Sequence, residues 1–234
     1  MQVTRDFPAT GPDVDHRHMH PGIWISFGHL NGQDYWRMKA QTRHEEFIKG
    51  PTVTGNHLTF VVRNSYLDEA GDALMCREVT TYTLSAEPEG VRMRIESVFD
   101  NPNADFYFGD QEESGLAFRM TPELSVKTGN GTILNSQGDR NGKKVWGKQT
   151  KWVDYSGVVD GRHVGIHVRP HETNARQCWM HARDYGVVAS VPFPRQPKGQ
   201  REPFVKTWVR KGEVYRLGYD VLVHDTPERF DPGR

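Results

Sequence analysis

The sequence predicts an all-β protein, an antiparallel β-sandwich with few or no helices. Apolar and polar residues alternate in several stretches, as along residues 91–99, and no long stretch repeats with a period of 3.6 residues. The 23 glycines and 14 prolines suit the many turns of a sandwich. Because all-β domains often reach 234 residues undivided, and no linker or repeat interrupts the chain, we expect residues 1–234 to form one domain.

The strands follow from local patterns, taken in chain order. Two strands flank the turn-like "DEAGD", and in the next one Val91, Met93, Ile95 and Phe99 alternate with charged residues, which predicts one buried face. The sequence "GVVDGRHVGIHV" predicts a hairpin with Asp160-Gly161 as its turn. We expect strands at 58–63, 74–84, 91–99, 157–168, 204–209 and 214–224.

Three connections carry weaker predictions. Residues 210–213, "RKGE", are expected to join 204–209 and 214–224 as a hairpin. A short helix is expected in "MHARDYG", residues 180–186. The proline-rich stretch Val191 to Pro203 is typical of a long surface loop.

Composition excludes several classes of partner. Thirty basic and thirty acidic residues balance, and without a basic tract nucleic acid is not expected as a partner. No apolar run approaches the roughly 20 residues of a membrane span, and the N-terminus lacks an apolar signal core, so we expect a soluble, cytoplasmic protein. Cys76 and Cys178 are expected to be buried small hydrophobes rather than a disulfide.

The segment "DVDHRHMHPGIW" places His16, His18 and His20 at every second position. If the segment is extended, the three imidazoles share one face, about 6.5–7 Å apart. A divalent metal site, hydrogen-bonding or catalytic histidines and a solvated loop all remain open. Because no third ligand type is evident in the sequence, we predict that the histidines line a ligand cleft without a tightly held metal.

Acidic residues cluster in the segment "FGDQEESGLAFRM". Asp110, Glu112 and Glu113 lie within four positions, and Arg119 follows. If these carboxyl groups converge, at least one pKa should be raised, which keeps an acid protonated near neutrality. A solvated acidic loop is the alternative.

Two further segments combine aromatic and titratable residues. The first, "VWGKQTKWVDYSG", carries Trp146, Lys148 and Asp154, and aromatic faces beside hydrogen-bonding groups suit sugar rings, although a strand with a core tryptophan explains part of the pattern. The second, "HETNARQCWMHARDYG", carries His181, Asp184 and Tyr185. His181 and Asp184 could form an acid–base pair or an ordinary structural pair.

Established catalytic motifs are missing from the sequence. It contains no G-x-S-x-G, no P-loop, no G-x-G-x-x-G and no H-E-x-x-H, and the cysteines lack zinc-ligand spacing. Elbow-type serine hydrolases, nucleotide kinases and dinucleotide-dependent dehydrogenases are therefore not first choices.

Together, these segments resemble a bacterial family of uncharacterised proteins, DUF6807. The matching stretches include "VTRDFP", "DHRHMHPGIWISFG", "GDQEESGLAFR", "NSQGDRNGKKVWGKQTKWVDYSG" and "ARDYGVVASVPF", in order along nearly the whole chain. Members typically have a further N-terminal stretch before "TRDFP". Many carry the automatic name "methane oxygenase", but a subunit of a membrane methane enzyme would need apolar spans that this sequence lacks.

The resemblance implies a β-sandwich and an association with sugar catabolism. The strand pattern of "TTYTLSAEPEGVRMRIESVFDN" is also similar to that of galactose-mutarotase-like supersandwiches, in which a histidine acts as acid and a carboxylate as base. The leading hypothesis is therefore a carbohydrate-active enzyme that isomerises, eliminates or hydrolyses a sugar or oxidised sugar. A non-catalytic carbohydrate-binding sandwich and a histidine-ligated metal enzyme are the alternatives.

The hypothesis assigns roles to residues that we expect to converge on one pocket. Glu113 would be the base and His18 or His181 the acid, with Asp184 beside His181. No cofactor is required, although a divalent metal could bind at the three histidines, and a homo-oligomer is compatible with the sequence. The residues expected to bind the small-molecule carbohydrate are His16, His20, Asp110, Glu112, Arg119, Trp146, Lys148, Asp154 and Tyr185.

Overall fold

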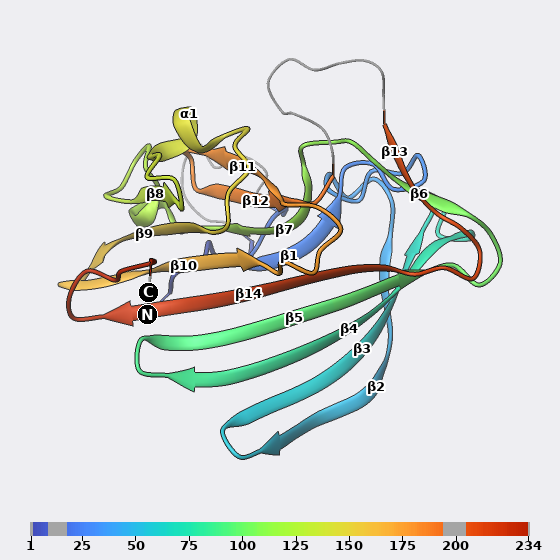
Figure 1. The fold of residues 1–234 in the computed structure, drawn as a ribbon, viewed down its shortest axis with the longest axis horizontal. Coiled ribbons are helices and arrows are strands. Elements are labelled where there is room, and N and C mark those ends of the chain that lie inside the picture. The colour runs from blue at the N-terminus through green and yellow to red at the C-terminus, as the bar shows by residue number, and fades with distance from the viewer. Residues whose placement is uncertain (1, 9–17, 194–204, 234) are drawn as a thin grey trace.

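The computed structural model describes residues 2–8, 18–193 and 205–233 and shows an all-β, antiparallel architecture, as predicted. Two sheets of very different size face each other, and a two-stranded ribbon lies at one end (Figure 1). Within the described residues, the helical elements are the single turn η1 (Pro122–Leu124) and the short α1 (Asn141–Val145).

The larger sheet has eight strands. In spatial order they are β2 (Thr42–Thr54), β3 (His57–Leu67), β4 (Leu74–Glu87), β5 (Gly90–Asp100), β14 (Tyr215–Thr226), β10 (Arg162–Pro170), β9 (Val153–Val159) and β8 (Thr132–Asn135). The predicted turn between β9 and β10 is confirmed. Asp160 and Gly161 both have positive φ, 50° and 76°, as a two-residue type I′ hairpin requires.

The smaller sheet has four strands, in the order β1 (Ile23–Phe27), β7 (Ser114–Arg119), β12 (Val187–Val191) and β11 (Trp179–Arg183). The ribbon pairs β13 (Lys206–Val209) with β6 (Phe106–Gly109). Figure 1 shows the smaller sheet over the β9–β10–β14 side of the larger sheet, with β2 to β4 extending beyond it.

The core lies between the two sheets. The Phe118 ring of β7 meets the Tyr155 ring of β9 at 6.4 Å between centroids, and the Tyr219 hydroxyl of β14 donates to the Ser190 carbonyl oxygen of β12 at 3.4 Å. All four residues are buried. These contacts fix which row of each small-sheet strand points into the core.

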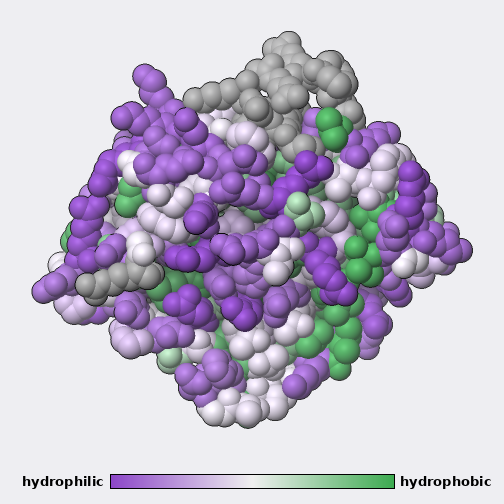
Figure 2. Space-filling view, in the orientation of Figure 1, coloured by the Kyte–Doolittle hydropathy of each residue, from purple (hydrophilic) through white to green (hydrophobic). Residues whose placement is uncertain are grey.

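The predicted alternation along β5 holds where the small sheet or the ribbon covers the strand. Ile95 and Phe99 are buried, whereas Val91 at the far end is 47% exposed, because the sheets no longer overlap there. In β2 every residue is exposed. The face shown in Figure 2 is accordingly mostly hydrophilic, in keeping with a chain in which 26% of residues are charged.

Two local predictions are wrong. Residues 210–213 do form a turn, but β13 pairs with β6 while β14 lies between β5 and β10, so the chain changes sheets there instead of making a hairpin. Asp105 holds this corner, since its carboxylate accepts hydrogen bonds from Arg210 and from the backbone of Lys211. The helix expected at 180–186 is instead strand β11, whose pairing with β12 outweighs a weak helical pattern.

Three other predictions concern the chain's ends, loops and cysteines. The stretch Val191 to Pro203 lies largely outside the described residues, although Val191 and Phe193 are buried. Both cysteines are buried and free, as expected. Within the part of the chain that the structure describes, no helix combines the length and apolar character that crossing a bilayer requires.

Candidate functional site

A row of four residues crosses the outer face of the smaller sheet. Trp24, Ala117, Ala189 and His181 are in register on β1, β7, β12 and β11. The adjacent row contains Phe118, which faces the core, so this row points away from the larger sheet. Ala117, Ala189 and His181 are nevertheless buried, so other side chains cover this row.

Glu112 lies against the His181 end of this row. Its Oε2 accepts a hydrogen bond from the Trp146 indole at 2.8 Å and lies 3.7 Å from His181 Nδ1. Its Oε1 accepts a hydrogen bond from Arg183 at 3.3 Å, and that guanidinium lies 4.1 Å from the centroid of the Trp146 ring. Two hydrogen-bond donors, Trp146 and Arg183, therefore hold one carboxylate, and the His181 ring lies within ion-pair distance of it.

These donors keep the carboxylate charged. Burial acts to raise the pKa of Glu112, but the contacts with His181, Trp146 and Arg183 more than offset it, and the pKa lies below its usual value. The raised pKa expected for the acidic cluster is therefore not found at this residue. The Glu112 side chain is 26% exposed and that of His181 only 2%, so the carboxylate meets solvent and the imidazole lies behind it.

Aromatic rings cover the other end of the row. His20 stacks on Trp24 at 5.0 Å and 12° and lies 5.0 Å from Trp36, and Trp36 meets His181 edge-on at 6.3 Å. His20 Nε2 is 3.0 Å from the Trp36 carbonyl oxygen. This chain of rings connects the histidine segment to His181.

The next row of the same face is cationic. Arg119 on β7 and Arg183 on β11 pair with opposite sides of Val187 on β12. Two strand spacings separate them, about 10 Å. The Arg119 guanidinium lies 5.1 Å from the centroid of the Tyr185 ring, which is 40% exposed. Of these residues, Arg183 contacts Glu112, whereas Arg119 is buried against Tyr185.

The structure thus brings together one residue from each of the three segments expected to converge: His20, Glu112 and His181. Other members of those segments point elsewhere. Glu113 forms an ion pair with Arg37. Asp110 is buried and accepts a hydrogen bond from the Val205 backbone at 3.1 Å.

The remaining predicted residues also separate from this group. Asp184 does not pair with His181; its Oδ1 accepts a hydrogen bond from the Gly142 backbone at 2.7 Å, at the start of α1. His18 is exposed and lies edge-on to Phe7 at 6.3 Å, and the Lys148 side chain is exposed. His16 lies outside the described residues.

The expected sharing of one face by the three histidines requires an extended segment. His18 lies in a turn and His20 has a φ of 60°, which breaks the alternation between them. Among the described residues, no group of three or more histidine, cysteine, aspartate or glutamate side chains is arranged to hold a metal ion.

Asp154 belongs to a separate, buried cluster on the outer face of the larger sheet. Its Oδ1 lies 3.1 Å from His224 Nε2 and 3.9 Å from His167 Nδ1, and its Oδ2 accepts a hydrogen bond from Ser156 at 2.6 Å. The Phe230 ring stacks on His224 at 4.2 Å. Burial lowers the pKa of His167 to about 4 despite the nearby carboxylate.

Sequence reasoning missed Trp24, Trp36 and Arg183 as parts of the site. Trp24 and Arg183 stand inside the segments that were singled out, so the residue types gave a usable signal. Their positions depend on the pairing of β1 and β11 with strands far away in sequence, which a residue pattern does not specify.

Comparisons with known proteins place the chain in a family. One solved structure that it resembles is a galactose mutarotase-like protein from Lactobacillus casei ATCC 334, with a TM-score of 0.38 and 10% identity over 88% of this chain and 90% of that one. A similarity of this size assigns neither site residues nor a substrate. No curated protein sequence matches the chain. A family model does match residues 1–231, and the chain therefore belongs to the family of unknown function DUF6807.

Proposed function

We propose that the protein is a carbohydrate-active enzyme and that Glu112 is its general base. One observation carries the proposal: a partly exposed carboxylate, kept ionised by His181, Trp146 and Arg183, stands beside the buried His181 at the outer face of the smaller sheet. An ionised carboxylate within reach of a ligand can accept a proton. This role replaces that expected for Glu113, whose carboxylate is occupied by Arg37.

The surroundings of Glu112 support a sugar as the ligand. The exposed Tyr185 ring offers an apolar face suited to the C–H face of a pyranose, and the Arg183 guanidinium offers hydrogen-bond donors to its hydroxyls. Arg119 and Arg183 lie on strands on either side of Val187; Arg119 is buried, and the Arg183 side chain is 26% exposed. The partly exposed Arg183 also favours an oxidised sugar, whose carboxylate its guanidinium would bind.

The proposed proton transfer uses the arrangement of a partly exposed Glu112 in front of the buried His181. Glu112 would take a proton from the sugar, and His181 behind it would stabilise or share that proton. Arg183 would stabilise negative charge that develops on the substrate. Isomerisation needs no other reactant, because the carboxyl group can return the same proton at a different atom.

A ligand screen followed by a proton nuclear magnetic resonance assay tests the proposal. Aldoses, uronates and keto-sugars are first screened by thermal shift, since a ligand that binds only the folded state raises the unfolding midpoint. Ligands that bind are then incubated with the protein at neutral pH. Anomeric exchange, a new sugar isomer, a vinyl proton or a released monosaccharide would identify the reaction class.

The screen also separates the alternatives. Binding of a sugar without any turnover, in both the presence and the absence of divalent metals, supports the carbohydrate-binding sandwich and contradicts the enzyme. Turnover that requires an added metal and is lost in His18→Ala with His20→Ala supports the metal-dependent reading. Metal-independent turnover that is lost in Glu112→Gln supports the proposal.

A further inference from the structure

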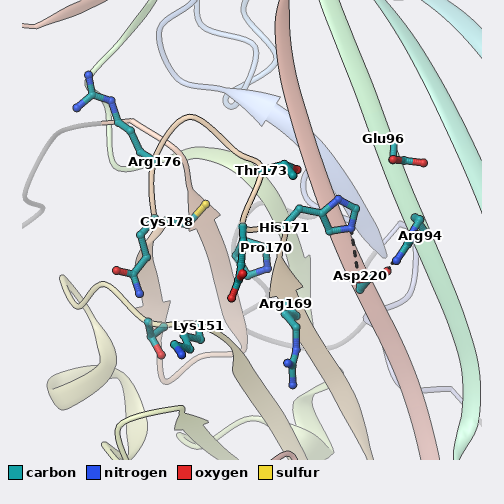
Figure 3. A pocket seen from close by; sticks show the side chains of 13 residues that line it. Arg94, Glu96, Lys151, Arg169, Pro170, His171, Thr173, Arg176, Cys178 and Asp220 are labelled. Atoms are coloured by element: carbon teal, nitrogen blue, oxygen red, sulfur yellow. Dashed lines mark hydrogen bonds and ion pairs between the residues drawn. The ribbon is translucent and has the colours of Figure 1, made fainter.

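A cavity of about 730 Å³ lies on the outer face of the larger sheet, away from Glu112 (Figure 3). Arg94 of β5 and Asp220 of β14 form its floor on the face opposite the buried Ile95–Tyr219 pair. The end of β10 and the loop 171–178 form its wall. Its volume lies within the range of small-molecule sites, roughly 300–1,000 Å³.

The wall is fixed to the sheet at a single glycine. The Asn174 side chain donates to the Gly218 carbonyl oxygen at 2.9 Å and accepts from the Gly218 amide at 2.7 Å, and the His171 amide donates to the same carbonyl at 2.9 Å. A Cβ at residue 218 would lie 2.1 Å from His171 Nδ1, so only glycine leaves room for the ring. The loop is therefore held in place without a ligand.

The acidic group on the floor is already neutralised. Asp220 Oδ1 lies 3.1 Å from Arg94 Nε, and Oδ2 lies 3.3 Å from His171 Nε2. Both carboxylate oxygens face a cationic or protonatable partner. Asp220 therefore presents little net charge to an anion in the cavity.

Three cations of the lining are not neutralised. Lys151, Arg169 and Arg176 are exposed and have no ion-pair partner among the described residues. Figure 3 shows them toward β10 and the loop, whereas Glu96 lies beyond Asp220 on the β5 side. The other carboxylate of the lining, Glu172, is exposed on the loop itself. The side of the cavity toward β10 and the loop thus carries three cations and one carboxylate, Glu172, and Glu96 lies apart from it on the β5 side.

We propose that this cavity is a second ligand site, which binds a small polyhydroxylated molecule through a phosphate or carboxylate group at Lys151 and Arg169. The cations suit an oxyanion. Glu96, Thr173 and Gln177, which also line the cavity, can hydrogen-bond hydroxyl groups. The described lining contains no phenylalanine, tyrosine or tryptophan, which argues against a flat apolar ligand.

Titration of the intact protein with inorganic phosphate tests the site, with sodium gluconate and glucose 6-phosphate as separate arms. We expect saturable binding by calorimetry or thermal shift that weakens as NaCl rises, because the cations are exposed. Arg169→Gln and Lys151→Gln should each weaken binding by about threefold to tenfold, because each removes one charge-assisted contact whose strength is reduced by exposure to solvent. Tighter binding of glucose 6-phosphate than of gluconate identifies phosphate as the recognised group, and the reverse order identifies carboxylate.

The matched control is Lys49→Gln, which removes an exposed cation from β2, far from the cavity lining. It should leave binding unchanged. An equal loss in Lys49→Gln and Lys151→Gln, or no saturable binding in any arm, would overturn the proposal. The result is independent of Glu112, since Glu112→Gln should retain binding at this cavity whether or not it loses turnover.

Discussion

Acidification should destabilise the protein through His167. This imidazole is 6% exposed, and burial lowers its pKa to about 4, against 6.5 for a solvated histidine. Between pH 6.5 and 4, His167 is therefore protonated in the unfolded chain but not in the folded chain, so the free energy of unfolding falls as the pH falls. At about 1.4 kcal/mol per pH unit of separation between the two pKa values, the loss amounts to roughly 3 kcal/mol.

Urea unfolding between pH 7.5 and 4.5 measures this effect, with His167→Gln as the variant that cannot titrate. The wild type should lose on the order of 2–3 kcal/mol more than the variant over this range. His163, whose pKa burial also lowers, is present in both proteins and so cancels in the comparison. Replacement of the exposed His18 by glutamine should leave the wild-type dependence intact.

Parallel pH dependences in the wild type and in His167→Gln would refute the reasoning. They would mean that Asp154, 3.9 Å from His167, compensates the buried charge after protonation and that the imidazole titrates near its normal value in the folded state.

Further predictions concern packing and the two thiols. Gly218→Ala should lower the free energy of unfolding by about 1–3 kcal/mol in urea, because its Cβ collides with His171; an unchanged midpoint would contradict the described fit. Gly161→Ala, at a φ of 76° with open space around it, should lower the free energy of unfolding by only about 1 kcal/mol. A larger destabilisation by Gly161→Ala than by Gly218→Ala would contradict this. Burial raises the pKa of both Cys76 and Cys178, the latter to about 12, so neither should react with a thiol reagent at pH 8 until the protein unfolds; rapid labelling of the native protein would contradict this.

The fold class and most strands could be predicted from the sequence because they depend on local alternation and turn chemistry. The β9–β10 hairpin is an example, since Asp160-Gly161 specifies its own turn. The partner of β13 could not be predicted in the same way. The sequence of residues 210–213 predicts a turn but does not distinguish a hairpin from a corner between two sheets. Asp105, about a hundred residues earlier in the chain, stabilises the corner.

The candidate site was predictable at the level of segments and not of side chains. Glu112 and Glu113 are neighbours with the same chemistry, yet they point to different partners, His181 and Arg37. Which of them faces the site depends on how the loop enters β7 and on the register of β7 with β1 and β12. The contact between Asp154 and His224 could likewise not be predicted, because His224 lies on a strand 70 residues away in the sequence.

The most direct test of the proposed function is the turnover rate of Glu112→Gln with the sugar that stabilises the wild type, measured by nuclear magnetic resonance at neutral pH. The substitution keeps the size of the side chain and one carbonyl acceptor, which can serve Trp146 or Arg183, but it removes the base. We expect a loss of turnover on the order of 100-fold or more, with the sugar still bound and with Glu123→Gln, an exposed glutamate outside the site, at the wild-type rate. A Glu112→Gln protein that turns the sugar over at the wild-type rate would contradict it.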